Sequence, residues 1–300
     1  MELRQLKYFV KVAKTKSFSA AAREMNLSQS AFSQQIQLLE AELQVKLFVR
    51  STRNVQLTEV GEELLPMVRR ILEDTSACLD TVQNSRTLRT GVLNIGCTYT
   101  FRPLLDDAVL TFMQRYPGVL LNMHVRPMEV LMDELCHHDL DIALSYRPLK
   151  PYPDVVSHVL FDNHLAAVMS DTHPLSHHNT IHLQALQHWQ LALPIAGMQA
   201  RDVLDTLLSN SQIQYHVRMQ SNNVDVLLAL AHRSHVVTFF SQATVSRTSG
   251  LVAIPLADVL PTMEGCYHVL KDQYQKRATR EFVKILSEIK LFSINKIIAD

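Results

Sequence analysis

The sequence has little of what most enzymes and secreted proteins rely on. It contains seven glycines and four cysteines among 300 residues, and it has no glycine-rich phosphate loop, no GxSxG elbow and no HExxH motif. The cysteines are far apart and form no CxxC pair, which argues against a disulfide framework and against a zinc knuckle. They are Cys78, Cys97, Cys136 and Cys266. We therefore expect reduced thiols, no cofactor, no metal and no enzymatic activity.

Long hydrophobic runs are absent as well. No segment approaches the ~18 consecutive apolar residues of a membrane span, and the N-terminus, MELRQLKYF, has no apolar signal core. We expect a cytoplasmic chain with no membrane partner. Hydrophobic residues make up 47% of the sequence, which is enough for packed cores, and the length predicts two or three domains.

Net charge is missing from the chain as a whole, because 29 basic residues balance 29 acidic ones. This balance conceals a gradient along the sequence. Residues 1–57 carry nine basic and four acidic side chains, a net charge of +5, which leaves −5 for the remainder. A basic segment of this kind favours binding to nucleic acid.

Hydrophobic patterns divide the chain into segments. Residues 1–57 show short helical patterns followed by strand signals at 46–49 and 55–57, which predict a small helical domain with a hairpin. Residues 58–90 predict one long helix, capped by Thr58, whose apolar positions have the spacing of a coiled-coil seam. The seam consists of Val60, Leu64, Met67, Ile71, Thr75, Cys78 and Val82. From residue 91 strands alternate with helices in two series, the pattern of two α/β lobes.

The sharpest local signal is SFSAAAREMNLSQSAFSQQIQLLEAEL, at residues 17–43. Ser19 is expected to cap a short helix that runs to Met25, and Ser28 to cap a second helix that runs to about Leu43. Asn26, between them, can take the left-handed conformation that a tight turn requires. The segment therefore predicts a helix-turn-helix.

The second of these helices has two different faces. Apolar residues from Phe32 to Leu43 recur at steps of 4, 3 and 4 and predict a buried stripe. The other face carries serine and glutamine, which can hydrogen-bond to base edges in the major groove. The hairpin that follows presents arginines suited to phosphates or to the minor groove. The predicted DNA-binding residues are Ser19, Ser28, Gln29, Ser30, Ser33, Gln34, Arg50 and Arg53.

This region resembles a known family. The string FVKVAKTKSFSAAAREMNLSQSAFSQQIQLLEAELQVKLFVRSTRNVQLTEVGEELLP is similar to the winged helix-turn-helix and linker helix of LysR-type transcriptional regulators. The strings VLNIGCT, RYPGVLLNMHV, LDIALSYRP and LAAVMSDTHPL resemble the effector domain of that family, so the resemblance covers essentially the whole chain. The chain departs from the family at Ser30, where many members have proline, and in AHRSHVVTFFSQA, which lacks the usual glycine-rich turn.

The resemblance implies an α+β multidomain protein and sets its expected boundaries. These are a winged helix-turn-helix domain at 1–57, a linker and dimerisation helix at 58–90, and an effector-binding domain at 91–300. The effector domain is expected to have two α/β lobes like type 2 periplasmic binding proteins, with lobe I at 91–161 and 266–300 and lobe II at 162–265. The resemblance also implies a bacterial regulator that dimerises, usually forms a tetramer, and binds double-stranded DNA at an interrupted inverted repeat. RNA polymerase is a further candidate partner.

A two-lobed fold of this type holds its ligand between the lobes, near strand ends and helix starts. The strand VLNIG ends before a turn whose threonine hydroxyls and free backbone N–H groups suit a carboxylate or an inorganic anion. We therefore expect a small anionic effector. The predicted effector-binding residues are Thr98, Tyr99, Thr100, Phe101, Arg126, Ser145, Tyr146, Ala196, Met198 and Asn222, the last of which is expected to open a helix.

Three alternatives stay open. Metal sensing would use Cys136-His137-His138 or the histidines of the segment 173–182, although histidine-rich loops are more often solvated than liganded. Redox sensing would use Cys97, if a helix dipole lowers the pKa of its thiol, although a role as a wall residue is favoured. A small-molecule binding protein with a helical appendage is the third, and it does not predict salt-dependent DNA binding.

Overall fold

The computed structural model describes residues 1–50, 55–83, 88, 90–148, 150–209, 215–245, 248–258, 262–271 and 274–297. The chain divides into two compact units, each with its own hydrophobic core. Unit 1 comprises residues 1–87 with 136–139, and unit 2 comprises residues 88–135 with 140–300. Within the described ranges, no helix is both long enough and apolar enough to cross a membrane.

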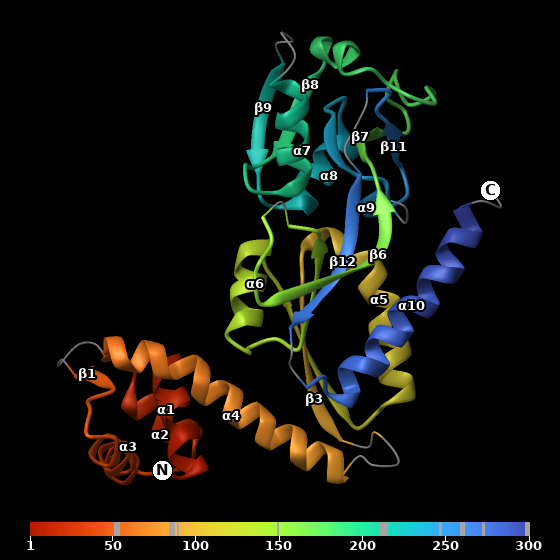
Figure 1. Cartoon of the computed structure of the whole chain (residues 1–300). Helices are drawn as coiled ribbons and strands as arrows, with labels where there is room; N and C mark the ends of the chain where they lie inside the picture. Colours follow the sequence, from red (N-terminus) through yellow and green to blue (C-terminus); the bar gives the residue numbers. More distant parts are fainter. Residues whose placement is uncertain are drawn as a thin grey trace. The chain divides into compact units, whose positions relative to one another are not determined.

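Unit 1 is a helical head with a two-stranded wing, followed by one long helix (Figure 1). Its helices are α1 (Leu3–Thr15), α2 (Phe18–Glu24), α3 (Gln29–Leu43) and α4 (Glu59–Gln83), and its wing strands are β1 (Phe48–Arg50) and β2 (Val55–Leu57). The two wing strands pair antiparallel. The predicted hairpin is confirmed, and the predicted long helix is confirmed as far as Gln83. Residues 84–87 and 89 of the expected linker lie outside the described residues.

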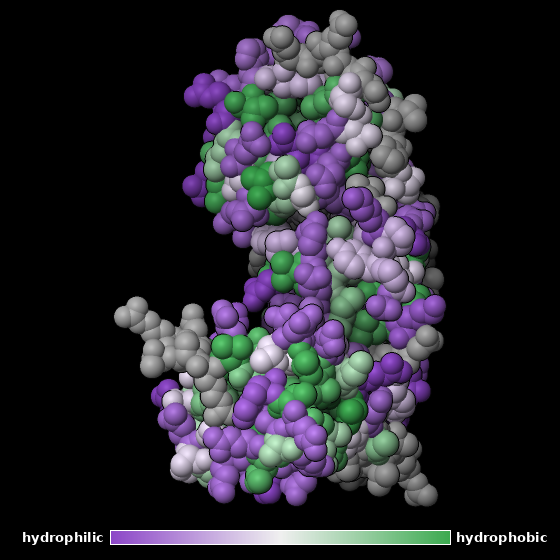
Figure 2. Space-filling model, turned by 60° about the vertical axis from the view of Figure 1, so that its left-hand side comes forward, coloured by the Kyte–Doolittle hydropathy of each residue, from purple (hydrophilic) through white to green (hydrophobic). Residues whose placement is uncertain are grey.

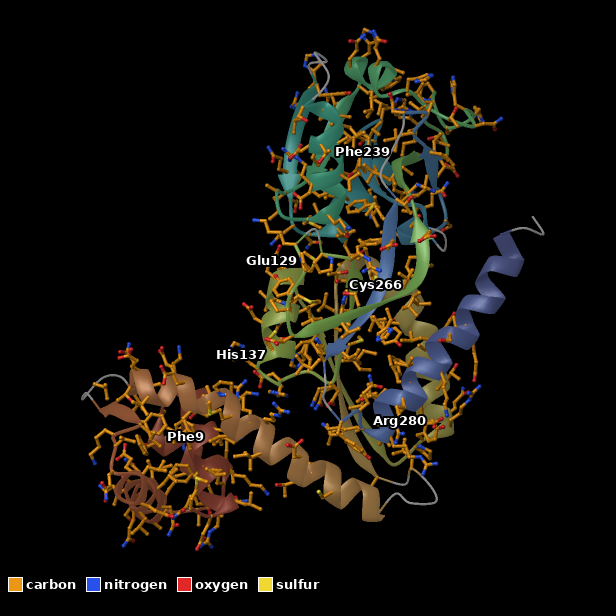
Figure 3. All side chains as sticks on the ribbon, in the orientation of Figure 1. Phe9, Glu129, His137, Phe239, Cys266 and Arg280 are labelled. Carbon is orange, nitrogen blue, oxygen red and sulfur yellow. The ribbon has the colours of Figure 1, made fainter. Side chains whose placement is uncertain are left out.

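Aromatic side chains from the helices and the wing form the core of the head. Phe9 of α1 is fully buried (Figure 3) and its ring centroid lies 5.4 Å from that of Phe48 in the wing. Phe18 of α2 also packs against Phe48, and Tyr8 of α1 packs against Phe32 of α3 at 4.8 Å. The wing is therefore part of the hydrophobic core of the head.

Unit 2 begins with a lobe built on a five-stranded sheet of order β4-β3-β5-β12-β6, in which β3, β4 and β5 are parallel. The helices α5 and α10 cover one face, where Phe112 contacts Phe282, and α6 covers the other, where Leu131 packs near Ala143 (Figure 1). The elements of this lobe are β3 (Gly91–Cys97), η1 (Tyr99–Phe101), α5 (Arg102–Arg115), β4 (Val119–Val125), α6 (Met128–Cys136), β5 (Ile142–Tyr146), β6 (Val155–Asn163), β12 (Met263–Leu270) and α10 (Arg277–Ile297).

The second lobe of unit 2 has a three-stranded sheet, β10-β7-β11, and a parallel pair, β8-β9. Its elements are β7 (Leu165–Ser170), η2 (Leu183–His188), β8 (Gln190–Pro194), α7 (Gln199–Leu208), β9 (His216–Ser221), α8 (Val224–Arg233), β10 (Thr238–Ser241), α9 (Gln242–Val245) and β11 (Leu251–Pro255). Phe239 is fully buried in this lobe (Figure 3). The chain enters the lobe from β6 and leaves it into β12, two strands that pair antiparallel. The expected lobe boundaries at 161/162 and 265/266 therefore fall inside these two strands. The expected two-lobed α/β fold is confirmed.

Candidate functional sites

The turn between α2 and α3 has the local geometry of a helix-turn-helix. Ser28 caps α3, because its Oγ accepts a hydrogen bond from a first-turn backbone N–H at 3.2 Å. Asn26 has a φ of 54°, in the left-handed region expected of it. The N-cap of α2 is Ser17, whose Oγ accepts a backbone N–H at 3.3 Å, and Ser19 lies inside the helix. The prediction that Ser19 caps α2 is therefore wrong, because the extended backbone that an N-cap requires occurs at Ser17.

The two faces of α3 differ as the sequence predicts. Phe32, Ile36 and Leu39 are fully buried. The polar residues predicted to bind DNA are exposed or, in the case of Ser33, half-buried; the exposed ones are Ser19, Ser28, Gln29, Ser30 and Gln34. The hydroxyl of Ser19 donates a hydrogen bond to Oε1 of Gln29 at 2.9 Å, so α2 and the start of α3 contribute to one polar surface. The side chain of Arg50 and the whole of Arg53 lie outside the described residues.

Glu40 is a functional candidate that the sequence pattern did not single out. It lies on the buried stripe of α3 and is 2% exposed. Its carboxylate accepts hydrogen bonds from the backbone at the start of the wing. Its spacing of four residues from Ile36 was the available signal, because a glutamate on an apolar stripe needs buried partners.

Helix α4 carries apolar side chains on its surface. Val60 is 44% exposed, Met67 63% and Ile71 40%, and Cys78 is exposed too. All four belong to the predicted coiled-coil seam. Leu64, by contrast, is half-buried and packs against the core of the head. The seam therefore begins at the head and continues along α4 with exposed apolar groups.

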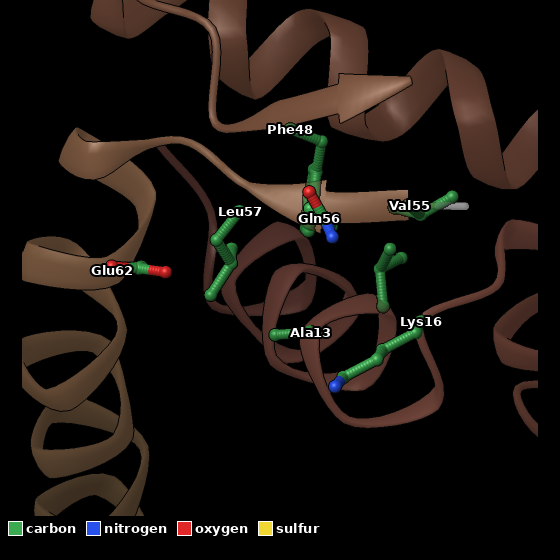
Figure 4. A pocket seen from close by; sticks show the side chains of 8 residues that line it. Ala13, Lys16, Phe48, Val55, Gln56, Leu57 and Glu62 are labelled. Atoms are coloured by element: carbon green, nitrogen blue, oxygen red, sulfur yellow. The ribbon is translucent and has the colours of Figure 1, made fainter. Parts of the chain in front are cut away.

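A groove of about 340 Å³ lies between α1, the wing and the start of α4 (Figure 4). Its lining is largely apolar, with Lys16 and Glu62 as its charged members. Among the residues that the structure describes, none from α2 or α3 lines it. This groove is therefore distinct from the polar surface of the helix-turn-helix.

In unit 2, three parallel strands end beside one another. The N–H of Arg126, after β4, donates to the carbonyl of Cys97 at the end of β3, with an N–O distance of 3.1 Å. The N–H of Thr98 donates to the carbonyl of Leu144 in β5 at 2.9 Å. The hydroxyls of Thr98 and Thr100 lie 3.3 Å apart. The predicted threonines and the backbone of Arg126 thus lie beside one another at the carboxyl edge of these strands.

This edge of the first lobe adjoins the second. The short helix η1, which holds Tyr99 and Thr100, contacts α9 of the second lobe. Both of these residues are half-buried. The side chain of Arg126 is 50% exposed, and its Nε lies 3.8 Å from the carboxylate of Glu134. Hydroxyl groups and a partly solvated guanidinium are the groups that can hold a small anion.

Phe101 and Tyr146 are more deeply buried than their predicted role suggested. The ring centroid of Phe101 lies 5.2 Å from that of Tyr146 and 5.5 Å from that of Phe161. Burial raises the pKa of Tyr146 to about 12, although its hydrogen bonds with Ser241 and Asn163 oppose that shift. Because Ser241 belongs to β10, the phenol connects the two lobes.

Ser145 lies on the face of the sheet opposite Tyr146 and is fully buried. Its Oγ donates to the carbonyl of Tyr146 at 2.9 Å and lies 2.9 Å from Nε2 of His268. The other ring nitrogen of His268, Nδ1, lies 2.9 Å from Oγ of Ser157. Burial lowers the pKa of His268 to about 4. The hydroxyl of Ser145 is thus engaged inside the sheet.

The predicted residues of the second lobe lie at helix starts. Ala196 is exposed after β8, and Met198 is the half-buried N-cap of α7. Asn222 is exposed. The helix that Asn222 was expected to open is capped by Asn223, whose Oδ1 accepts the N–H of Val226 at 3.3 Å. The prediction was one residue early, because Asn222 lies in the bend before the cap.

The geometry weighs against the redox and metal alternatives. Burial raises the pKa of the Cys97 thiol to about 12 and that of Cys266 to about 11, so the suggestion that a helix dipole lowers the pKa of Cys97 is wrong. Buried thiols of this kind are inert, since the thiolate is the reactive form. His173 is buried against Trp189, with ring centroids 4.2 Å apart. In the described part of the chain, no three metal-binding side chains gather.

Comparison with known proteins identifies two family models in the chain. The model described as "LysR substrate binding domain" matches residues 86–289, and the model described as "Bacterial regulatory helix-turn-helix protein, lysR family" matches residues 3–62. Transcriptional dual regulator GltC of Bacillus subtilis is 27% identical over 93% of this chain and 93% of its own. HTH-type transcriptional regulator BudR of Raoultella terrigena is 34% identical over 62% of this chain and 65% of its own.

Solved structures share the fold over nearly the whole length. A full-length OxyR variant from Pseudomonas aeruginosa has a TM-score of 0.76 at 22% identity, covering 97% of this chain and 94% of its own. Full-length CbnR in complex with its target DNA has a TM-score of 0.64 at 22% identity, covering 96% and 99%. Both similarities show that the fold is shared. At 22% identity, neither indicates which ligand this chain binds.

Proposed function

This chain belongs to the LysR family of transcriptional regulators, and from that membership we propose how its two units act. It is a DNA-binding regulator with an effector-binding domain, and its relatives are regulators, not enzymes. We propose that α3 enters the major groove and presents Gln29, Ser30, Ser33 and Gln34 to base edges. Ser19, Ser28 and the wing arginines Arg50 and Arg53 would contact the backbone and hold the register.

The observation that carries this proposal is the division of α3 into an apolar face, where Phe32, Ile36 and Leu39 are fully buried, and a serine and glutamine face that is largely exposed. An uncharged polar face can read bases by hydrogen bonds, while the net charge of +5 over residues 1–57 supplies attraction to phosphates.

The test uses the full-length protein and duplexes that it selects from a random library. Gln34→Ala and Gln29→Ala are expected to weaken binding to the selected duplex by about 5- to 150-fold each, the range of a bidentate base contact. Gln184→Ala, an exposed glutamine of unit 2, is the matched control and should bind like the wild type. Wild-type protein that shows neither sequence preference nor salt-dependent affinity would contradict the proposal.

We propose self-association through α4. Two copies would bury Val60, Met67 and Ile71 against each other. Such a dimer would place its two helix-turn-helix domains on the half-sites of an interrupted inverted repeat. Met67→Glu is expected to convert the dimer to monomer in analytical ultracentrifugation, whereas Arg70→Glu, at an exposed polar position of the same helix, should leave the dimer intact. A dimeric Met67→Glu protein would rule out this seam.

Further apolar groups support a second contact that would give a tetramer. On the first lobe Leu110 and Met113 of α5 are 59% and 54% exposed, and Leu120 of the edge strand β4 is 59% exposed. On the second lobe Val217 of β9 is 41% exposed, and hydrophobic side chains are visible among polar ones on the side where β9 lies (Figure 2). RNA polymerase stays a candidate partner.

We propose that a small anion binds at the turn after β3, held by the hydroxyls of Thr98 and Thr100 and by Arg126. Two observations support this position: the two hydroxyls lie 3.3 Å apart, and the backbone of Arg126 is hydrogen-bonded beside them at the strand edge where η1 contacts the second lobe. A panel of inorganic anions and aromatic carboxylates should include a compound that raises the melting temperature of the full-length protein by mass action. Thr100→Val should abolish that shift, and Thr248→Val, at an exposed threonine, should retain it. An equal shift of the melting temperature in both variants would show that the compound binds at another site.

A further inference from the structure

Glu40 is an acidic side chain in a position where acids are costly. The side chain is 1% exposed, and an isolated carboxylate cannot stay ionised in such surroundings without hydrogen bonds and an opposite charge. Its backbone lies in the last third of α3, beyond the polar residues at the start of that helix. The carboxylate therefore has a task other than direct contact with DNA.

Three hydrogen bonds that this carboxylate accepts come from the segment that opens the wing, residues 46–48. Oε1 accepts the N–H of Leu47 at 2.9 Å and the N–H of Phe48 at 3.4 Å. Oε2 accepts a hydrogen bond from Nζ of Lys46 at 3.1 Å. Glu40 thus connects residues 46–48, the last of which is the first residue of wing strand β1, to the recognition helix.

The same wing segment is held from its other side by the start of α4. The hydroxyl of Thr58 donates to the carbonyl of Lys46 at 2.7 Å, and the N–H of Thr58 donates to the carbonyl of Leu47 at 3.0 Å. Gly61 packs so closely that a methyl group there would overlap the carbonyl oxygen of Leu47. Residues 46–48 are therefore a shared support for α3, the wing and α4.

We propose that Glu40 is a positioning residue for DNA binding: its buried carboxylate fixes the wing on the recognition helix and, through residues 46–48, fixes the start of α4 on the same head. This inference rests on the proposed function, in which α3 and the wing contact DNA and α4 joins two copies. Its consequence is that both DNA-contacting elements and the dimerisation helix move as one body.

The test compares Glu40→Ala, Glu40→Gln and Glu42→Gln in the full-length protein. Binding to the duplex selected by the wild type is measured over a range of salt, together with hydroxyl-radical footprints. Glu40→Ala is expected to bind roughly tenfold more weakly, with a shallower salt dependence, because the wing loses phosphate contacts. Its footprint should lose protection at the flanks of each half-site and keep it at the centre.

Glu40→Gln and Glu42→Gln are controls for the loss of a negative charge, and Glu40→Asp is used if Glu40→Ala does not fold. Glu40→Gln keeps an oxygen that can accept the N–H groups of Leu47 and Phe48, so it should restore affinity to within about twofold. Glu42→Gln removes the same charge from an exposed position, 54% exposed, and should bind like the wild type. If Glu40→Ala is not folded by circular dichroism, Glu40→Asp, which keeps the charge but falls short of the wing, is expected to give the same flank loss.

The inference is overturned if the folded Glu40→Ala or Glu40→Asp protein keeps the wild-type salt dependence and flank protection. It is also overturned if affinity falls with salt dependence and footprint unchanged, because that pattern indicates a general loss of folded protein. A wild-type protein that binds DNA without salt dependence would instead defeat the proposed function, so the two failures are distinguishable.

Discussion

Acidification should destabilise unit 2 through His268. The ring belongs to β12, which lies between β5 and β6, and it is buried with partners for both of its nitrogens. Because the hydroxyl of Ser145 donates to the carbonyl of Tyr146, its oxygen is left to accept the N–H of Nε2. Nδ1 then accepts the hydroxyl of Ser157. The fold therefore selects one neutral tautomer, and burial lowers the pKa of His268 from 6.5 to about 4.

Protonation of His268 lowers the stability of the folded state, because burial lowers the pKa of this histidine there. A group whose pKa is lower in the folded state favours folding while it is neutral, so its contribution is complete above pH 6.5 and is lost as the pH falls toward 4. At 1.36 kcal/mol per pKa unit, the difference between 6.5 and about 4 amounts to about 3 kcal/mol. That loss would be a large fraction of the stability of an ordinary domain.

The assay is urea unfolding of the full-length protein at a series of pH values from about 7.5 to about 4.5, across the transition of this histidine. Fluorescence of the single tryptophan, Trp189, reports on unit 2. His268→Gln should lose less stability on acidification than the wild type, by most of the ~3 kcal/mol worked out from the pKa shift. His216→Gln, at an exposed position of β9, is the matched control and should follow the wild type. Parallel curves for the wild type and His268→Gln would refute the reasoning.

Other perturbations have equally definite outcomes. Alkylation of the native protein should modify exposed Cys78 and spare Cys97 and Cys266, whose pKa values burial raises to about 12 and about 11; peptide mass spectrometry would reveal an error if Cys97 reacts as fast as Cys78. Asn26→Ala should lower the stability of unit 1 by about 1 kcal/mol, because alanine is disfavoured at positive φ, and Asn26→Gly should not; equal melting by circular dichroism would contradict this. Gly61→Ala should cost about 1 to 3 kcal/mol by overpacking against a backbone carbonyl, and an unchanged melting temperature would show that α4 can shift.

Local signals made unit 1 largely predictable. Ser28, Asn26 and the apolar stripe beginning at Phe32 each depend on a few neighbouring residues, and each behaves as expected. The wrong prediction for the cap of α2 also comes from reasoning on neighbouring residues alone. Serine is a favourable N-cap residue at either Ser17 or Ser19, and only the backbone conformation decides between them. Local sequence patterns do not distinguish between two equivalent residues that are two positions apart.

The candidate effector site was less predictable because burial depends on both faces of the sheet. Strand ends could be located from the sequence, so Thr98 and Arg126 were expected near each other, and they are. Alternation along β5, however, sends Ser145 and Tyr146 to opposite faces. Their partners, His268 and Ser241, lie far away in the chain, at a separation that no local pattern can connect. The sequence therefore predicts which residues lie at strand ends, but it does not predict which side chains they contact.

The composition of the recognition surface gives a physical reason for the support around Glu40. Serine and glutamine read DNA by hydrogen bonds, which weaken steeply when distance or angle departs from the ideal. Phosphate contacts from the wing set the register of α3 on the duplex. A head that carries Gln29 and Gln34 on α3 therefore depends on a fixed wing to place those hydrogen bonds. Loosening residues 46–48 should accordingly reduce the preference for the selected duplex over random DNA more than it reduces binding to random DNA.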